Sequence, residues 1–312
     1  MGSGDGPRSG MVALVGRPNA GKSTLLNALI GDKVAIVSDK PQTTRNRIIG
    51  ILSEERGQVV FFDLPGVHKP LHKMNARMMQ EVRSALEEVD VVLHLLDASQ
   101  MWGGGEEYLF ELLDPIRPEV VGVLTKVDLV KAKGDVLPMI ERYGARRADT
   151  PIVPISALKG DGLADLMGEL FKRLPEGPPL YPTDLATTQT ERFFVSEVVR
   201  EKLLERTRNE LPYTTGVVVD LFEESERLLH VEAVVYVERK SQKGIVIGKG
   251  GSMIRSVGQA AREELEKVLG IKIYLGLRVK VHPRWRDDPS VLIEMEPGTA
   301  DLSGFGEPTD VN

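Results

Sequence analysis

The sequence contains no cysteine, few aromatic residues and no long apolar run, and each absence excludes a class of protein. Without cysteine the chain can form neither a disulfide framework nor a thiolate metal site, and we expect it in a reducing cytoplasm. A membrane-spanning helix needs about 18 or more consecutive apolar residues, whereas the apolar runs here are short, such as residues 91–93. With 41% hydrophobic and 28% charged residues, the composition is typical of a globular protein.

Length and composition divide the chain into regions. A domain commonly spans about 100 to 200 residues, so 312 residues predict two domains. Residues 1–10 are rich in glycine and serine and lack the apolar core of a signal peptide, so we expect a disordered leader there. Proline and glycine cluster over residues 176–188, which predicts a linker. The two domains are then residues 11–175 and 189–286, and we expect residues 287–312 to form a loosely ordered tail.

The first domain alternates short apolar runs with longer amphipathic segments. Such alternation predicts an α/β fold, in which helices flank a mostly parallel sheet and ligands bind at the carboxyl ends of the strands. The runs expected to form strands are residues 12–15, 59–62, 91–96, 120–124 and 152–155.

A glycine-rich motif follows the first of these strands. Residues 16–23 read GRPNAGKS, the pattern of a phosphate-binding P-loop, and they lead into a predicted helix over residues 22–30. Glycines let backbone N–H groups surround a phosphate, and the amino end of the helix adds partial positive charge. We expect Lys22 to neutralise phosphate oxygens and Ser23 to bind Mg²⁺. A plain glycine-rich turn is the less specific alternative.

Two further segments extend this site towards a metal ion. Asp63 ends the second predicted strand, and Gly66 follows it in an Asp-x-x-Gly motif. We expect the Asp63 carboxylate to hold Mg²⁺ and the Gly66 N–H to meet the γ-phosphate. Between the two motifs, Thr44 is favoured over Thr43 as a second hydroxyl ligand, and an ordinary loop is the alternative. The expected catalytic residues are Lys22, Ser23, Thr44, Asp63 and Gly66, and the expected magnesium ligands are Ser23, Thr44 and Asp63.

Residues 125–128, TKVD, directly follow the strand expected at 120–124, which places them where a ligand binds. They indicate which base is bound. The Asp128 carboxylate can accept hydrogen bonds from N1–H and the exocyclic amine of guanine, and adenine offers no such pair of donors. A backbone N–H near Ser156 can reach the guanine O6, so the sequence predicts GTP and GDP as ligands. The residues expected to contact the nucleotide are Gly16, Arg17, Pro18, Asn19, Ala20, Gly21, Lys22, Ser23, Thr24, Asp63, Leu64, Pro65, Gly66, Val67, Thr125, Lys126, Val127, Asp128, Ser156 and Ala157.

These motifs, in this order, resemble those of translation-factor-type GTPases over residues 11–175, and the whole chain resembles the Era family of ribosome-associated GTPases. The resemblance implies an enzyme that hydrolyses GTP to GDP and phosphate. The family pattern has asparagine where this chain has Thr125, so we expect a modest loss of nucleotide affinity.

The residue after the Asp-x-x-Gly motif, Val67, does not supply the group that orients the attacking water in related enzymes. Ras-like enzymes place a glutamine there to orient the attacking water, and Val67 can neither accept nor donate a hydrogen bond. We therefore expect slow intrinsic turnover, with two sources of assistance open. A partner can insert a catalytic group, or a monovalent cation can neutralise charge near Asn19. Related GTPases with this P-loop asparagine suggest K⁺, which makes potassium a hypothesis that rests on the resemblance.

The second domain reads as helix, two strands at 216–221 and 228–237, two helices, and a strand at 271–281. This α-β-β-α-α-β order, with GKGG at 248–251 between the helices, resembles the α+β KH (type II) domain, whose GxxG loop holds the backbone of single-stranded RNA. An ordinary turn between helices is the alternative. The expected RNA-binding residues are Ile247, Gly248, Lys249, Gly250, Gly251 and Arg255.

Positive charge is concentrated in the same domain. Residues 239–286 carry twelve basic and three acidic side chains, a net charge of +9, whereas the whole chain carries −6. A local basic excess on an acidic chain is typical of a nucleic-acid-binding surface. Part of this excess is also compatible with an ordinary solvated helix surface.

The partners are implied by the resemblance alone. It implies binding to the 3′ end region of small-subunit (16S) ribosomal RNA, action on the 30S subunit during its assembly, and peripheral contact with the inner membrane. We expect a cytoplasmic monomer. Two other functions remain open: a GTPase whose basic domain docks on membrane or on a protein, and a non-catalytic RNA-binding assembly factor.

Overall fold

The computed structural model describes residues 6–40, 43–67, 73–207 and 211–298. Its first sheet has the strand order β2-β3-β1-β4-β5-β6. β2 runs antiparallel to β3, and the other neighbouring strands are parallel. The strands are β1 (Arg8–Gly16), β2 (Ile48–Glu54), β3 (Gly57–Asp63), β4 (Val91–Asp97), β5 (Glu119–Thr125) and β6 (Ile152–Pro154). The predicted α/β class with a mostly parallel sheet is confirmed.

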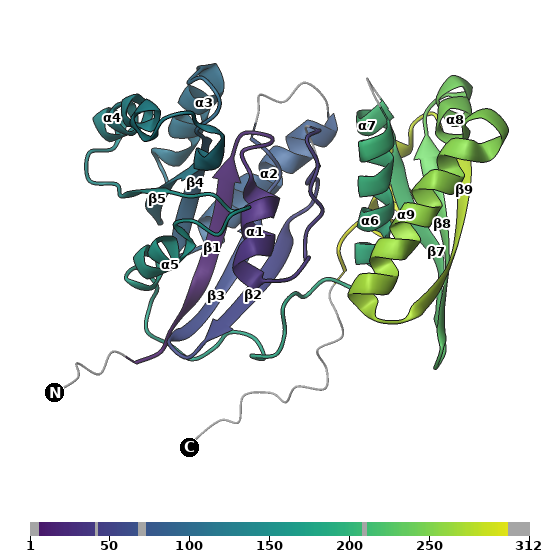
Figure 1. The fold of residues 1–312 in the computed structure, drawn as a ribbon, viewed down its shortest axis with the longest axis horizontal. Helices are drawn as coiled ribbons and strands as arrows, with labels where there is room; N and C mark the ends of the chain where they lie inside the picture. Colours follow the sequence, from purple (N-terminus) through teal and green to yellow (C-terminus); the bar gives the residue numbers. More distant parts are fainter. Residues whose placement is uncertain (1–5, 41–42, 68–72, 208–210, 299–312) are drawn as a thin grey trace.

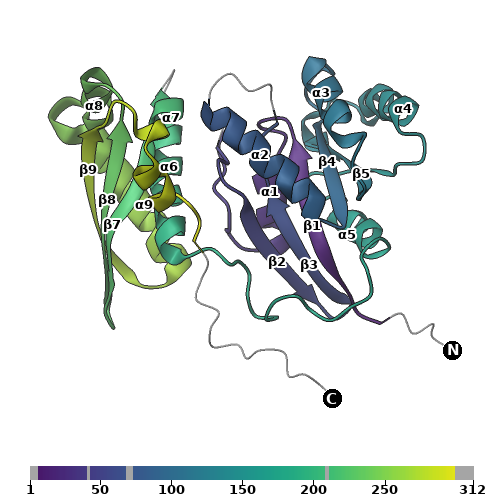
Figure 2. The same ribbon diagram turned by 180° about the vertical axis from the view of Figure 1, so that it is seen from behind.

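Helices cover both faces of this sheet (Figures 1 and 2). Successive residues of a strand point to opposite faces, so Val12 and Leu14 pack in one core with α1 and α5, whereas Ala13 and Val15 pack in the other with α2 and α3. Burial on both faces explains why the strands are apolar throughout. The helices are α1 (Lys22–Ile30), α2 (Lys73–Glu88), α3 (Gly104–Leu113), α4 (Leu137–Arg146) and α5 (Leu163–Phe171).

Two strands differ from the expectation. β1 begins at Arg8, so residues 8–10, expected in a disordered leader, pair with β3 at Gly57–Val59. Composition suggested a leader, but the parallel ladder between β1 and β3 continues through Arg8, Ser9 and Gly10. β2 was not expected at all, and its close packing on α1 depends on Gly50, where a Cβ atom would lie 2.6 Å from the Leu26 side chain.

The stretch expected to be a linker, residues 176–188, packs along the edge of the first sheet. The Ile51 N–H donates to the Ala186 carbonyl at 2.8 Å, and the Thr187 hydroxyl donates to the Ile49 carbonyl at 2.6 Å. Buried Gln58 accepts hydrogen bonds from the N–H groups of Leu180 and Tyr181 at 2.8 and 2.9 Å. The stretch therefore follows a defined course to the second domain.

The second domain is a three-stranded sheet, β7-β8-β9, with α6 and α9 packed on one face (Figure 1). β7 and β8 are antiparallel, whereas β8 and β9 are parallel. The predicted α-β-β-α-α-β order is present, with one additional short helix, α7. The elements are α6 (Glu191–Arg206), α7 (Leu211–Thr214), β7 (Gly216–Glu224), β8 (Leu228–Val237), α8 (Lys240–Ile247), α9 (Ser252–Leu269) and β9 (Lys272–Val281).

Chain beyond the last strand is more ordered than its composition suggests. A short 3-10 turn at Trp285–Asp287 and a helix, α10 (Pro289–Glu294), follow β9. Trp285 is buried in a small core on the second face of the β7-β8-β9 sheet, and its ring N–H donates to the Thr214 carbonyl at 3.1 Å. One aromatic anchor thus orders a segment that shows no sequence period. No helix within the described ranges is long and apolar enough to span a membrane.

Candidate functional site

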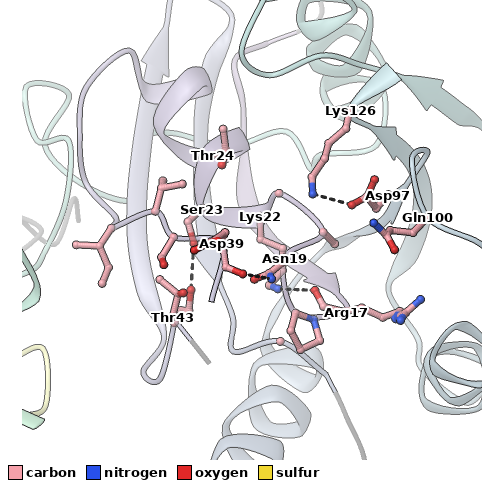
Figure 3. A pocket seen from close by; sticks show the side chains of 18 of the residues that line it. Arg17, Asn19, Lys22, Ser23, Thr24, Asp39, Thr43, Asp97, Gln100 and Lys126 are labelled. Carbon is pink, nitrogen blue, oxygen red and sulfur yellow. Dashed lines mark hydrogen bonds and ion pairs between the residues drawn. The ribbon is translucent and has the colours of Figure 1, made fainter. Parts of the chain in front are cut away.

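The P-loop turn joins β1 to α1 and lines a cavity of about 470 Å³ (Figure 3). Asn19 and Gly21 adopt positive φ angles of 63° and 92°, and α1 begins immediately afterwards at Lys22. Positive φ is easy for glycine and tolerable for asparagine, which explains why these residue types occupy the turn. The predicted nucleotide-binding residues that line the cavity are Arg17, Pro18, Asn19, Ala20, Gly21, Lys22, Ser23, Thr24, Gly66 and Lys126, and Thr44, a predicted magnesium ligand, lines it as well.

The three residues proposed as magnesium ligands converge. Ser23 Oγ lies 2.5 Å from Asp63 Oδ2 and 3.0 Å from Thr44 Oγ1, and Thr44 Oγ1 lies 3.3 Å from Asp63 Oδ2. Thr43 instead donates its hydroxyl to the Lys40 carbonyl at 2.6 Å, so the structure brings Thr44, and not Thr43, to Asp63. Such a set of oxygen atoms has the chemistry that Mg²⁺ prefers.

Burial shifts the pKa values of two charged residues at this cluster, Lys22 and Asp63. Burial lowers the pKa of Lys22, and the nearby Asp63 carboxylate opposes that shift. Burial raises the pKa of Asp63, and Lys22 opposes it. The Lys22 ammonium donates to the Arg17 carbonyl at 3.2 Å. An anionic phosphate and a divalent cation would each stabilise the charged form of one partner, so the pair is suited to their joint binding.

Gly66 passes close to the P-loop. A Cβ atom at Gly66 would lie 2.7 Å from the Pro18 Cα atom, so only glycine fits without a shift of the backbone. The next N–H, of Val67, donates to the Gly16 carbonyl at 3.0 Å, and the Val67 side chain is buried in the core with Leu64. Val67 therefore anchors this segment, and its apolar side chain offers nothing to orient a water molecule.

The residues expected to recognise the base lie beside the cavity at the ends of β5 and β6. Ser156 donates its hydroxyl to Asp128 Oδ1 at 2.6 Å, which orients the carboxylate. The Thr125 hydroxyl lies 2.8 Å from the Ala20 carbonyl and 3.1 Å from the Leu96 carbonyl. Thr125 thus connects this loop to the P-loop, the bracing role for which the family pattern supplies asparagine. The predicted contact residues that do not line the cavity are Gly16, Asp63, Leu64, Pro65, Val67, Thr125, Val127, Asp128, Ser156 and Ala157.

Several acidic residues at the cavity were missed by sequence reasoning. Asp97 at the end of β4 forms an ion pair with Lys126 at 2.6 Å. Glu106 at the start of α3 pairs with Arg17 at 3.1 Å, and burial raises the pKa of Glu106. Gln100 also lines the cavity. The position of Asp97 at a strand's carboxyl end was the one available signal.

Asn19 faces the loop that precedes Thr44. Its side-chain N–H donates to the Asp39 carbonyl at 2.6 Å, and both residues line the cavity (Figure 3). An asparagine amide and a backbone carbonyl therefore lie together next to the P-loop, where the cation hypothesis places K⁺.

The GxxG loop of the second domain joins α8 to α9 through three glycines with positive φ, at Gly248, Gly250 and Gly251. A Cβ atom at Gly248 would lie 2.8 Å from the Met253 N atom, whereas one at Gly250 would meet nothing within 4 Å. Arg255 donates to the Gly250 carbonyl at 2.6 Å, and Lys249 is exposed. The loop is thus open to a ligand on the side of Gly250.

A groove of about 910 Å³ runs from this loop along the edge strand β9. Of the expected RNA-binding residues, Ile247 and Gly248 line it. Sequence reasoning counted the groove's basic residues as charge but did not place them at the site. These residues are Lys240, Lys243, Arg278 and Lys280. Asp220 also lines the groove and pairs with Arg278 at 2.8 Å, and the other three cationic side chains suit an extended polyanion.

Comparison with known proteins agrees with both modules. Residues 11–126 match the family described as 50S ribosome-binding GTPase, and residues 210–286 match the KH domain family. The chain is 46% identical over 286 residues to GTPase Era of Heliobacterium modesticaldum, covering 91% of this chain and 95% of that protein. The chain belongs to the Era family. As an Era-family protein, it is a GTPase with a C-terminal KH domain.

Solved Era structures share the whole fold. A variant of Aquifex aeolicus Era bound to GDP and AlF4⁻ superposes with a TM-score of 0.88 at 38% identity, covering 92% of this chain and 98% of that one. Era in complex with MgGDPNP and nucleotides 1506–1542 of 16S ribosomal RNA gives a TM-score of 0.89 at 38% identity, covering 93% and 98%. The resemblance inferred from the motifs is therefore confirmed, and both domains share their arrangement with Era.

Proposed function

We propose that this chain binds GTP and GDP with Mg²⁺, hydrolyses GTP, and presents its KH domain to the 3′ end region of 16S ribosomal RNA during assembly of the small ribosomal subunit. In this proposal the nucleotide state of the GTPase domain controls RNA binding by the KH domain. The observation that carries the proposal is the convergence of Ser23, Thr44 and Asp63 beside the buried Lys22. Relatives bound to MgGDPNP and to GDP with AlF4⁻ support the choice of ligand.

The residues present fit a magnesium ion. Asp63 Oδ1 is buried and has no hydrogen-bond partner among the described residues, which leaves an anionic oxygen for a cation to satisfy. Ser23 and Thr44 would add their hydroxyl oxygens. The metal would neutralise charge on the phosphates, while the P-loop N–H groups and Lys22 bind them in place.

Because Val67 cannot orient water, a second cation is part of the proposal. The Asn19 side-chain N–H donates directly to the Asp39 carbonyl at 2.6 Å, so K⁺ would replace this hydrogen bond and bind the Asn19 side-chain oxygen and the Asp39 carbonyl oxygen next to the P-loop. A monovalent cation there would supply the positive charge that an arginine finger supplies elsewhere. The hydrolysis rate should rise when K⁺ replaces Na⁺ at constant ionic strength; equal rates in both salts would remove potassium from the mechanism.

The RNA part of the proposal rests on the KH domain groove. The GxxG loop offers close backbone approach at Gly250, and the basic side chains along β9 offer charge. We propose that the protein acts on the 30S subunit as a cytoplasmic monomer. A membrane is the alternative partner, and binding of the protein to anionic vesicles tests it. The membrane would be favoured if a Gly250→Asp, Gly251→Asp double variant still binds the vesicles and its RNA binding is unchanged from that of the native protein.

GTP hydrolysis by variants of the metal cluster tests the enzymatic part. Ser23→Ala and Thr44→Ala each remove a proposed ligand, so the Mg²⁺ concentration at half-maximal rate should rise and kcat should fall. Thr43→Ala is the matched control, because the Thr43 hydroxyl bonds to Lys40 and not to Asp63. Absence of any turnover by the native protein would favour the non-catalytic assembly factor.

A further inference from the structure

The helix α6 of the second domain lies against the GTPase domain (Figure 1). It meets the loop that carries Thr44, of which the structure describes residues 33–40 and 43–46; these residues are called the switch segment below. The contacts join residues about 160 positions apart in the chain, so they couple the two domains directly.

Arg200 of α6 makes the contact next to Thr44. The Arg200 side chain is buried, and its Nη2 atom donates a hydrogen bond to the Thr43 carbonyl. Glu197, one turn earlier, accepts from Nε of Arg200 at 2.7 Å and from Nη2 at 2.5 Å. Because a guanidinium is planar and this one is held at two points, its orientation towards Thr43 is defined.

The next residue of α6, Glu201, holds the other end of the switch segment. Glu201 is 3% exposed, and its Oε1 accepts from the Val37 N–H at 2.8 Å. Its Oε2 pairs with the Lys33 ammonium at 2.6 Å, and Lys33 also pairs with Glu264 of α9. The second domain therefore contacts the switch segment at Lys33, Val37 and Thr43. After Thr44, Arg45 and Asn46 also donate to the Thr215 and Met295 carbonyls, each at 2.9 Å.

The Thr43 carbonyl belongs to the same planar peptide group as the Thr44 nitrogen. Fixing the direction of that carbonyl restrains the backbone of Thr44 and the direction of its side chain. The Thr44 hydroxyl lies 3.0 Å from Ser23 Oγ and 3.3 Å from Asp63 Oδ2. Arg200 thus acts on the metal cluster through one peptide group, without touching the cluster itself.

We propose that Arg200 is a positioning residue for the magnesium site, by which the second domain holds Thr44 in place for the metal. The inference rests on the proposed function of the nucleotide site and adds to it a contribution from the KH side of the molecule. Coupling between two sites is reciprocal. A nucleotide with Mg²⁺ that orders Thr44 therefore also strengthens the docking of α6 on the switch segment.

The test is GTP hydrolysis by the full chain and by Arg200→Ala, with Mg²⁺ titrated at saturating GTP. A hydrogen bond to a charged group is lost, so we expect kcat to fall about tenfold or more, and half-saturating Mg²⁺ to rise several-fold. GDP affinity in excess Mg²⁺ should change less than about twofold, because the base loop and P-loop do not contact Arg200. A merely structural role would move GDP affinity and melting temperature together with kcat.

Arg206→Ala is the matched control. Arg206 lies on the same helix and its hydrogen bonds to Ser256, Lys202 and Glu205 stay within the second domain. It should show native kcat and native dependence on Mg²⁺. Arg200→Lys keeps one donor that can reach Thr43 and should recover part of the lost rate.

If Arg200→Ala folds poorly, Glu197→Gln becomes the test. This variant keeps the Arg200 guanidinium as a donor to Thr43 but weakens the contact that orients it, so we expect an intermediate loss of kcat. Native kcat and native Mg²⁺ dependence in both Arg200→Lys and Glu197→Gln, or in a folded Arg200→Ala, would overturn the proposal. GTP turnover by the native protein distinguishes this result from failure of the proposed function. If the native protein does not hydrolyse GTP, the enzymatic proposal fails. If the native protein hydrolyses GTP and the variants do so equally well, only the role of Arg200 is refuted.

Discussion

Replacing Thr125 with valine should weaken guanine-nucleotide binding, because the Thr125 hydroxyl connects the base loop to the P-loop. The hydroxyl lies 2.8 Å from the Ala20 carbonyl and 3.1 Å from the Leu96 carbonyl, and Thr125 is 3% exposed. Valine keeps the shape but leaves both carbonyls without this donor. A buried group that loses its partner costs about 1–3 kcal/mol, and about 2 kcal/mol corresponds to roughly 30-fold in affinity.

The reverse change, Thr125→Asn, tests the same reasoning with the opposite sign. A hydroxyl carries one proton and can donate to one carbonyl at a time, whereas an asparagine amide has two N–H donors. One added hydrogen bond is worth about 1 kcal/mol, so we expect roughly fivefold tighter binding.

Both variants can be measured by fluorescence anisotropy of a labelled GDP, with melting temperature recorded in parallel. Thr150→Val, a half-buried position that does not line the nucleotide cavity, controls for the loss of any threonine hydroxyl. Native affinity in Thr125→Val, within about twofold, or weaker binding by Thr125→Asn would refute the bridging role of the hydroxyl.

Substitutions of Asp128, of His94 in the buried strand β4 and of Gln58 test three further positions. Asp128→Asn replaces an acceptor for guanine's exocyclic amine with a donor, so GDP affinity should fall about 100-fold and xanthosine diphosphate should bind better than GDP. Competition binding measures both affinities. A retained preference for GDP would contradict the role of Asp128 in guanine recognition. Burial lowers the pKa of His94 from 6.5 to about 3, so the unfolded state binds the extra proton between these values. The contribution of His94 to stability is therefore complete above pH 6.5 and falls on acidification by about 1.4 kcal/mol per pH unit, a slope that urea unfolding should find in the native protein and not in His94→Leu. Gln58→Leu removes the acceptor for the Leu180 and Tyr181 N–H groups. The free energy of unfolding should therefore fall by about 2–4 kcal/mol. A loss below about 1 kcal/mol would show that other contacts hold residues 176–188 in place.

The sequence predicted the parts of the site that belong to continuous motifs. The P-loop, Asp63, Gly66 and the TKVD segment were placed correctly at strand ends, because strand, turn and helix signals surround each of them. Thr44 was favoured over Thr43 on weaker grounds, and the structure places Thr44 beside Asp63.

What sequence reasoning missed depends on contacts between distant residues. Asp97 and Glu106 are single acidic residues with no motif around them, and only the fold brings them to the cavity. β2 escaped prediction because it is an antiparallel strand in a pattern read as parallel units. Arg200 could not be assigned, because its partner Thr43 lies in the other domain and no periodicity connects the two.

The same division applies to the chain ends. Arg8 continues a ladder with β3 that composition does not reveal, and Trp285 orders the segment after β9 by packing into a small core. Local composition describes how a segment behaves alone, whereas both segments are stabilised by tertiary contacts.

Control of RNA binding by the nucleotide state of the GTPase domain can be tested in a single binding experiment. The full chain would be titrated into a labelled single-stranded oligonucleotide matching the 3′ end of 16S ribosomal RNA, with a GTP analogue, with GDP and without nucleotide, each at the same salt concentration. We expect tighter binding with the GTP analogue than with GDP, and loss of binding in the Gly250→Asp, Gly251→Asp variant. Equal affinity in all three nucleotide states, or binding that survives the loop variant, would contradict it.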